Sequence, residues 1–207
     1  MFIVIDAIDG AGKGRQRLEL VKYLTARNMP VESIEFPFHD TFYKTVIHPA
    51  LQGEAKLNPA SWVLAYLLDK TLHAGQIAPY VGDPHKFMIA DGYFTTTIAY
   101  QSFLMKQVSI KKLLTYGKEF QIPVPDLAIY LDVKPEVAVS RKQQEEGHDE
   151  GPDMFEKDIA KQQKLSSIFQ KMVKDQVYCE WEQADGNGSV EDVTANITAI
   201  LKKRKLI

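Results

Sequence analysis

The beginning of the chain joins a short apolar run to a glycine-rich turn, and this combination restricts the possible folds more than any other feature. Residues 2–6 read Phe-Ile-Val-Ile-Asp, which is typical of a strand buried on both faces of a parallel sheet. The turn at residues 7–14 reads Ala-Ile-Asp-Gly-Ala-Gly-Lys-Gly, and residues 15–27 then carry apolar side chains at helical spacing. A buried strand, a glycine-rich turn and a helix in this order favour an α/β fold.

The turn matches a phosphate-binding pattern, which consists of a glycine, four residues, Gly-Lys and then Ser or Thr. The spacing and the Gly-Lys pair agree, although Ala7 replaces the first glycine and Gly14 replaces the hydroxyl residue. Gly10 and Gly12 allow backbone N–H groups to face an anion, the helix adds its positive dipole end, and Lys13 adds a full charge. We therefore expect this turn, hereafter the phosphate loop, to bind nucleotide phosphates. The alternative is an ordinary glycine-rich connection between a strand and a helix.

The glycine at position 14 also affects how a metal ion would bind. A hydroxyl group at this position of the pattern normally binds magnesium. Without it, we expect Mg²⁺ to be held by phosphate oxygens, water and carboxylates such as Asp9 and Asp91.

Strand and helix patterns alternate along the rest of the chain. Further strands are predicted at residues 31–36, 86–91, 126–132 and 177–182. Helical spacing covers residues 61–77, 93–105 and 153–173, and a last helix begins after Ser189, where Asp192 completes a capping box. This alternation indicates a five-stranded parallel sheet with helices on both faces. Residues 143–152 contain two glycines, a proline and four acids, so we expect an exposed mobile loop there.

The composition suits one globular domain spanning residues 1–207, because 45% of the residues are hydrophobic and domains usually contain about 100–200 residues. A net charge of −2, from 25 basic and 27 acidic residues, argues against a protein that coats nucleic acid. The one cysteine, Cys179, excludes an internal disulfide, and we expect it to pack within a strand. No apolar run approaches the roughly 20 residues that span a bilayer, and we see no signal peptide. We therefore expect a cytoplasmic protein without nucleic-acid or membrane partners.

Short segments along nearly the whole chain resemble, in order, the motifs of the thymidylate kinase family. They are residues 2–13, Phe36-Pro37, residues 64–70, residues 91–101, residues 125–132 and residues 153–156. In the first segment, Asp6 replaces the usual Glu and Ala7 the usual Gly. No single segment is decisive, whereas the ordered set is specific.

The resemblance implies a P-loop NTPase fold, a three-layer α/β sandwich with a mobile lid at about residues 141–153. It implies an enzyme that moves the γ-phosphoryl group of ATP to dTMP, giving dTDP, with Mg²⁺, and a homodimer packed through helices. Two alternatives stay open at this point. One is a kinase of the same fold for another nucleoside monophosphate or a deoxynucleoside, and the other is a catalytically weak nucleotide-binding protein.

The resemblance also assigns roles to individual residues. It implies catalytic roles for Lys13, Asp9, Arg141 and Asp91, with Asp91 and Asp9 facing magnesium. It places ATP on Asp9, Gly10, Ala11, Gly12, Lys13, Gly14 and Arg15. It places the acceptor on His39 (phosphate), Tyr66 (stacked on the base), Lys70, Thr97 and Gln101 (base) and Tyr100 (ribose).

Three positions depart from the family pattern where arginines are usual. Gly92 stands in place of an Arg that grips the acceptor phosphate, His39 in place of a second and Lys70 in place of a third. Lysine cannot reproduce the planar fork of a guanidinium group. Candidate replacements are Arg15, Arg17 and Lys44, and we expect either a different acceptor, a rebuilt phosphate site or weak activity.

Overall fold

The computed structural model describes residues 1–144 and 159–207, and its centre is one parallel sheet of five strands. The strands are β1 (Phe2–Asp6), β2 (Val31–Glu35), β3 (Phe87–Asp91), β4 (Leu127–Asp132) and β5 (Trp181–Asp185). Their order across the sheet is β2-β3-β1-β4-β5, and every neighbouring pair is parallel. All residues of β1 are buried, which confirms the prediction of a strand covered on both faces.

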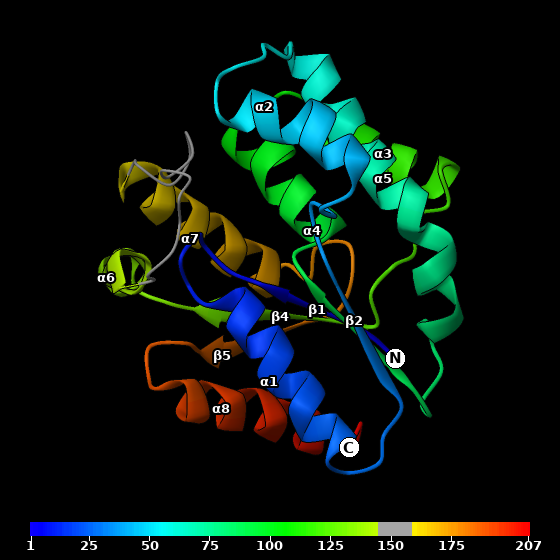
Figure 1. The fold of residues 1–207 in the computed structure, drawn as a ribbon, viewed down its shortest axis with the longest axis vertical. Helices are drawn as coiled ribbons and strands as arrows, with labels where there is room; N and C mark the ends of the chain where they lie inside the picture. The colour runs from blue at the N-terminus through cyan, green and yellow to red at the C-terminus, as the bar shows by residue number, and fades with distance from the viewer. Residues whose placement is uncertain (145–158) are drawn as a thin grey trace.

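Helices cover both faces of this sheet (Figure 1). They are α1 (Lys13–Thr25), α2 (His48–Leu51), α3 (Pro59–Ile77), α4 (Phe94–Thr97), α5 (Ile110–Glu119), α6 (Pro135–Gln144), α7 (Ile159–Lys174) and α8 (Val190–Lys203). Three shorter helical segments are η1 (Tyr43–Ile47), η2 (Ala78–Tyr80) and η3 (Ile98–Leu104). Helices α1 and α8 pack together on one face, while α7 and η3 lie together on the other. The predicted three-layer α/β architecture is therefore confirmed.

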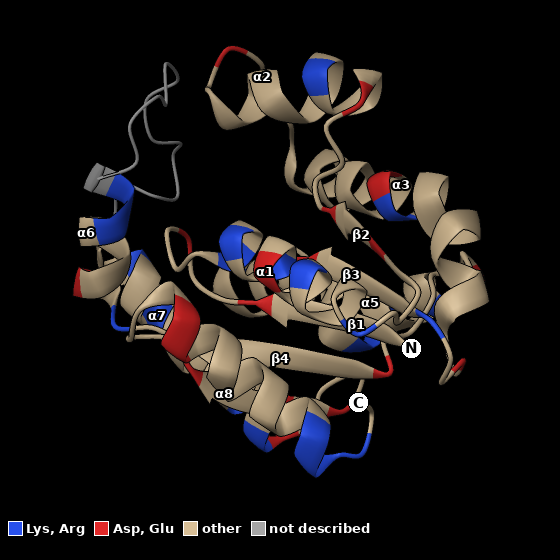
Figure 2. Cartoon of the chain, turned by 60° about the horizontal axis from the view of Figure 1, so that its bottom comes forward, with Lys and Arg blue, Asp and Glu red and all other residues tan. Residues whose placement is uncertain are grey.

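The carboxyl ends of three neighbouring strands carry acids and meet at one edge of the sheet. Asp6 ends β1, Glu35 ends β2 and Asp91 ends β3, and Glu35 lies opposite Asp91 in the register of the sheet. In Figure 2 the lengths of β1, β3 and β4 are largely without charge, in agreement with their apolar sequences. The phosphate loop leaves this same edge, because it follows β1 directly. In open α/β sheets, ligands bind at this edge.

The pattern that predicts the fifth strand at residues 177–182 is wrong in its boundaries. Gln176 and Tyr178 have φ angles of 49° and 76°, and this left-handed conformation cannot continue an extended strand. The side chain of Gln176 accepts a hydrogen bond from the Trp181 N–H at 2.7 Å. The strand therefore begins at Trp181, and Cys179 lies in the connection before it and not within a strand.

Two other predicted segments differ from the structure. Residues 93–105 do not form one α-helix, because η3 is a π-helix in which the Met105 N–H donates to the Tyr100 carbonyl five residues earlier. Residues 143 and 144 belong to α6 and not to a loop. The rest of the predicted lid, and the family-like segment 153–156, lie outside the described residues.

Asp126 ties β1 to the loop before β3, which suggests a test of the fold. Its carboxylate accepts from the Phe2 N–H at 2.7 Å and from the Gly82 N–H at 3.0 Å. Asp126→Ala should lower the free energy of unfolding by about 1–3 kcal/mol, because these donors lose their acceptor. Denaturant unfolding measures this change. Asp175→Ala, at an exposed pair with Lys171, is the control and should have little effect. An equal loss in both variants would contradict this role of Asp126.

Candidate functional site

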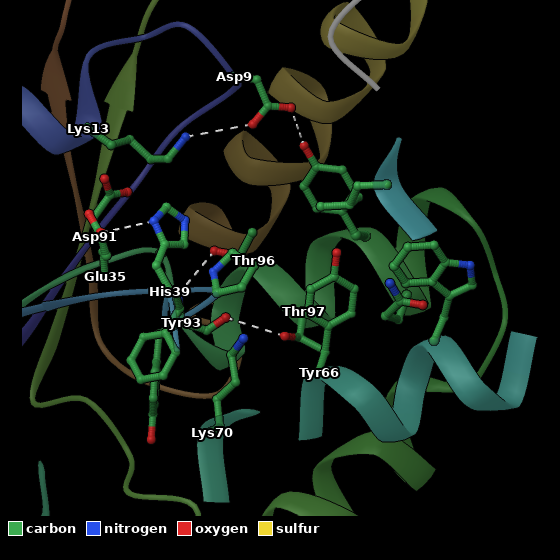
Figure 3. Close-up of a pocket in the computed structure, with 17 residues that line it drawn as sticks. Asp9, Lys13, Glu35, His39, Tyr66, Lys70, Asp91, Tyr93, Thr96 and Thr97 are labelled. Carbon is green, nitrogen blue, oxygen red and sulfur yellow. Dashed lines mark hydrogen bonds and ion pairs between the residues drawn. The ribbon is translucent and has the colours of Figure 1, made fainter. Parts of the chain in front are cut away.

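A cavity of about 300 Å³, hereafter the main cavity, opens at the carboxyl edge of the sheet (Figure 3). It is lined by residues from the phosphate loop, the ends of β2 and β3, and helices α3 and η3. The predicted site residues that it brings together are Asp9, Lys13, His39, Tyr66, Lys70, Asp91, Thr97, Tyr100 and Gln101. Residues spread over the first half of the chain thus share one concave surface, which is the usual setting of a ligand site.

The backbone of the phosphate loop requires glycine at two positions. Gly10 and Gly12 have φ angles of +77° and +92°, which side chains rarely adopt. A Cβ atom on Gly10 would also lie 2.7 Å from the carbonyl oxygen of Ala138 in α6. Gly12 caps α1 and offers no side chain to the first N–H groups of the helix, which receive no capping hydrogen bond from it. An anion can therefore reach the first N–H groups of α1.

Lys13 lies folded across the phosphate loop. Its ammonium donates to the carbonyl oxygens of Ile8 at 3.3 Å and Ala7 at 3.4 Å, and it lies 3.8 Å from Asp9 Oδ1. The other carboxylate oxygen of Asp9 accepts a hydrogen bond from the Tyr100 hydroxyl at 2.5 Å. Asp9, labelled in Figure 3, thus connects the phosphate loop to η3, and both it and Tyr100 line the cavity.

The carboxylate of Asp91 lies over the first turn of α1. A Cβ atom on Gly14 would be 3.2 Å from Asp91 Oδ2, so the glycine leaves room for this carboxylate. Burial raises the pKa of Asp91, while the charges of Lys13 and Arg17 act in the opposite direction. A hydroxyl-bearing side chain at position 14 would compete with Asp91 for this space.

The oxygen donors beside Lys13 fit an ion that takes most of its ligands from elsewhere. Asp9 and Asp91 both line the main cavity. Within residues 1–144 and 159–207, no group of three or more His, Cys, Asp or Glu side chains is placed to hold a metal. Magnesium commonly binds through one or two carboxylates together with phosphate oxygens and water, and this pair suits that pattern.

Asp6 is completely buried beneath the cavity, and the sequence does not reveal its role. It accepts a hydrogen bond from the Thr96 hydroxyl, and Thr96 Oγ1 in turn accepts from the Tyr93 N–H at 3.1 Å. Burial raises the pKa of Asp6, and the bond from Thr96 opposes this effect. The pair joins the end of β1 to the start of α4, and Thr96 lines the cavity.

Aromatic side chains and one buried ammonium form the other end of the cavity. Tyr66 stacks on Trp62 with ring centroids 5.7 Å apart, and Trp62 also lines the cavity. Lys70 is buried, with its ammonium 2.8 Å from Asp69 Oδ2 and 5.2 Å from the centre of the Tyr66 ring. Asp69 Oδ1 accepts from the Phe38 N–H at 3.0 Å, so the position of the ammonium is fixed. Trp62 is not among the site residues predicted from the sequence. Its spacing of four residues from Tyr66 on one helix is the signal that could have identified it.

Thr97 and Gln101 add buried polar groups at this same end. Both side chains are buried and both line the cavity. Gln101 Oε1 has no hydrogen-bond partner within the part of the chain that the structure describes. A buried acceptor of this kind favours a ligand that carries a donor, because leaving it unpaired costs about 1–3 kcal/mol.

The expected replacements for the missing arginines do not lie in the main cavity. Within the described residues, Arg15, Arg17 and Lys44 are all absent from its lining. Arg15 pairs with Glu19 at 3.0 Å, and Arg17 holds Glu35 at 2.9 Å. Lys44 is exposed on η1.

Gly92 and His39, which replace two family arginines, do line the main cavity. Gly92 has a φ angle of +61°, and a Cβ atom there would lie 3.1 Å from Thr96 Oγ1, so an arginine at this position would be strained. His39 Nδ1 lies 3.5 Å from Glu35 Oε1.

A second cavity of about 350 Å³ lies along the outer residues of the phosphate loop. Residues 10–12 line it together with Arg15 and Arg141. Arg141 donates to the Ala11 carbonyl at 2.9 Å and to the Gly188 carbonyl at 2.8 Å. The loop is therefore shared between two cavities, with Asp9 and Lys13 in one and Arg15 and Arg141 in the other.

The contact between Gly10 and α6 predicts different costs for two alanine substitutions. Gly10→Ala combines a left-handed φ with an overlap on a backbone oxygen, so the loop must shift. Losing one charge-assisted hydrogen bond to phosphate should weaken ATP binding about tenfold or more, as measured by calorimetry. Gly53→Ala is the matched control, because its φ is +80° but nothing lies within 4 Å of the added atom. Equal ATP affinities in the two variants would refute the assigned contact.

Comparison with known proteins identifies relatives over nearly the whole chain. A family model described as thymidylate kinase matches residues 5–197. The thymidylate kinase of Carboxydothermus hydrogenoformans is 27% identical over 204 residues, which cover 97% of this chain and 96% of that protein. The thymidylate kinase of Leptospira borgpetersenii is 32% identical over 178 residues, covering 84% of this chain and 81% of that protein. The thymidylate kinase of Plasmodium falciparum is 24% identical over 205 residues, covering 99% of this chain and 91% of that protein.

These matches agree with the fold and with the glycine-rich loop at the edge of the sheet. The family model begins within β1 and ends within α8, so the match includes all five strands. The chain therefore belongs to the thymidylate kinase family of P-loop nucleoside monophosphate kinases, which use ATP as the phosphoryl donor.

Proposed function

We propose that this chain transfers the γ-phosphoryl group of ATP to dTMP and releases ADP and dTDP. The observation that carries the proposal is the phosphate loop shared by two cavities, since a donor and an acceptor nucleotide must approach one another across it. Arg15 and Arg141 belong to the donor side, and the acceptor occupies the main cavity. Phosphoryl transfer depends mainly on positioning and on neutralising charge, which is what this arrangement supplies.

The phosphate loop performs the charge neutralisation on the donor side. Its N–H groups and the amino end of α1 receive the β- and γ-phosphates, with Gly10 and Gly12 providing the backbone conformation. Lys13 exchanges its contacts with Asp9 and two backbone carbonyls for the phosphate oxygens. Asp9 and Asp91 would hold magnesium, which when bound neutralises charge on the phosphates and aligns them.

The polar groups at the aromatic end of the main cavity support thymine as the acceptor base. Thymine presents an N–H group between two carbonyl oxygens on its pairing edge, so a site for it needs both an acceptor and a donor. The ammonium of Lys70 supplies donors, and Gln101 Oε1 supplies a buried acceptor. Tyr66 provides a ring on which the base stacks, and Tyr100 and Thr97 close the remaining sides.

An ADP-release assay with a panel of acceptors tests this proposal. We expect dTMP to be turned over faster than dUMP, dCMP, dAMP, dGMP and thymidine. Lys13→Ala should lower kcat by about 10²–10³, because a charged donor to the transferred group is lost. Its melting temperature should stay near that of the unaltered protein, since the ammonium bonds only weakly, at 3.3–3.8 Å, to Asp9 and two carbonyls of the loop. Faster turnover of another acceptor would refute the substrate, and ATP binding without transfer would favour a nucleotide-binding protein of weak activity.

We also propose a cytoplasmic homodimer that packs through α3. Leu64, Leu68 and Leu72 are 57%, 45% and 54% exposed and lie four residues apart, so they form one apolar stripe along the helix. This stripe supports the helical dimer interface that the family resemblance implies. Among the described residues, no helix has the length and apolar character that crossing a bilayer requires.

Substituting the centre of the stripe tests the dimer. Leu68→Glu places a charge in the proposed interface, where burial without a partner is costly, and should convert the dimer to a monomer in sedimentation experiments. Leu18→Glu, at a leucine of α1 that is 47% exposed, is the matched control and should leave the dimer intact. A monomeric unaltered protein, or dissociation in both variants, would refute the interface.

A further inference from the structure

The acceptor end of the main cavity has few cations that can meet a phosphate. Lys13 serves the donor phosphates, and Lys70 lies at the aromatic end, bound to Asp69 at 2.8 Å. Among the described residues that line the cavity, His39 is the remaining side chain able to carry a positive charge. Gly92, which replaces a family arginine, offers no side chain. The geometry around His39 therefore decides how a phosphate is held.

A chain of contacts leads from α1 to His39. The guanidinium of Arg17 donates to Ser33 Oγ and to Glu35 Oε2, both at 2.9 Å. Glu35 Oε1 lies 3.5 Å from His39 Nδ1. The imidazole ring also stacks on Tyr43, with centroids 4.4 Å apart. Figure 3 shows one nitrogen of the His39 ring turned toward Glu35, and this side chain, which is 56% exposed, lines the cavity.

These contacts explain how a carboxylate can stand beside a phosphate site. On its own, the charge of Glu35 would repel an anionic acceptor, but Arg17 neutralises it from behind. Glu35, 3.5 Å from Nδ1, then attracts this side of the ring and leaves Nε2 for a ligand, as a carboxylate does for other functional histidines.

We propose that Arg17 and Glu35 are positioning residues that hold His39 as the cation for the acceptor's phosphate group. This proposal rests on the proposed function, because it assumes that dTMP binds in the main cavity. It assigns a role to Glu35, which the sequence pattern does not mark as a site residue, and it gives Arg17 a positioning role in place of the direct phosphate contact considered from the sequence. The other charged residues that line the cavity with His39 are Asp9, Lys13, Glu35, Lys70 and Asp91, and Arg17 contacts Glu35 from outside the lining.

Calorimetry with two ligands, dTMP and thymidine, separates a phosphate contact from a general effect on the cavity. His39→Ala should weaken dTMP binding about tenfold or more, the value of a charge-assisted hydrogen bond, and leave thymidine binding nearly unchanged. His85→Ala, at an exposed histidine outside the cavity, is the control and should alter neither affinity. An equal loss for both ligands would overturn the phosphate contact.

The sign of the Glu35→Gln effect separates positioning from simple charge. If Glu35 positions His39, its substitution weakens dTMP binding, and the double variant with His39→Ala is no weaker than His39→Ala alone. If Glu35 acts only as a negative charge, removing it strengthens dTMP binding and overturns the proposal. Glu32→Gln, at an exposed glutamate of β2 outside the cavity, is the matched control.

His39→Arg supplies a second readout, because arginine keeps a positive charge at this position. It should restore much of the dTMP affinity that His39→Ala loses and leave thymidine binding nearly unchanged. A loss of dTMP affinity as large as that of His39→Ala would overturn the proposal. If the unaltered protein binds no dTMP, the proposed function fails too, whereas unchanged binding in His39→Ala refutes this inference alone.

Discussion

Burial of β1 between β3 and β4 holds the phosphate loop in place. Every residue of this strand is buried, so its carboxyl end delivers the loop to a fixed point at the edge of the sheet. Beyond that point, Gly10 packs against the backbone of Ala138, and Arg141 donates to the carbonyl of Ala11. The loop is thus supported from the sheet and from α6, which preorganises its N–H groups for an anion before any nucleotide binds. Both cavities depend on this arrangement because both include residues of the loop.

The strands with continuous apolar runs could be predicted from the sequence because burial on both faces leaves a clear pattern. The fifth could not be placed correctly, since the apolar alternation across residues 177–182 includes Tyr178, which takes a left-handed conformation to pack against Phe94. Helix α6 gave little signal, because it carries few apolar residues and is held by tertiary contacts such as those of Arg141. The π-helical form of η3 could not be predicted either, because over seven residues the hydrophobic periodicity does not distinguish a π-helix from an α-helix.

The site was predictable where it follows a local motif and unpredictable where distant residues meet. The phosphate loop follows from its glycines and Lys13, and the acceptor residues that the family resemblance names lie together in the lining of the main cavity. The contact of Arg17 with Glu35 joins α1 to the end of β2, and the spacing of these two residues in the sequence does not predict it. Asp69, which fixes the Lys70 ammonium, looks in the sequence like an ordinary helix acid. The roles of these residues remain predictions that the experiments above address.

The space above α1 links two positions that lie far apart in the sequence. A Cβ atom at position 14 would lie 3.2 Å from Asp91 Oδ2, so any side chain there requires this carboxylate to move by a few tenths of an ångström. Restoring the usual hydroxyl would therefore shift one proposed magnesium ligand while adding another. The effect of such a change on the metal site belongs to both groups together and not to the hydroxyl alone.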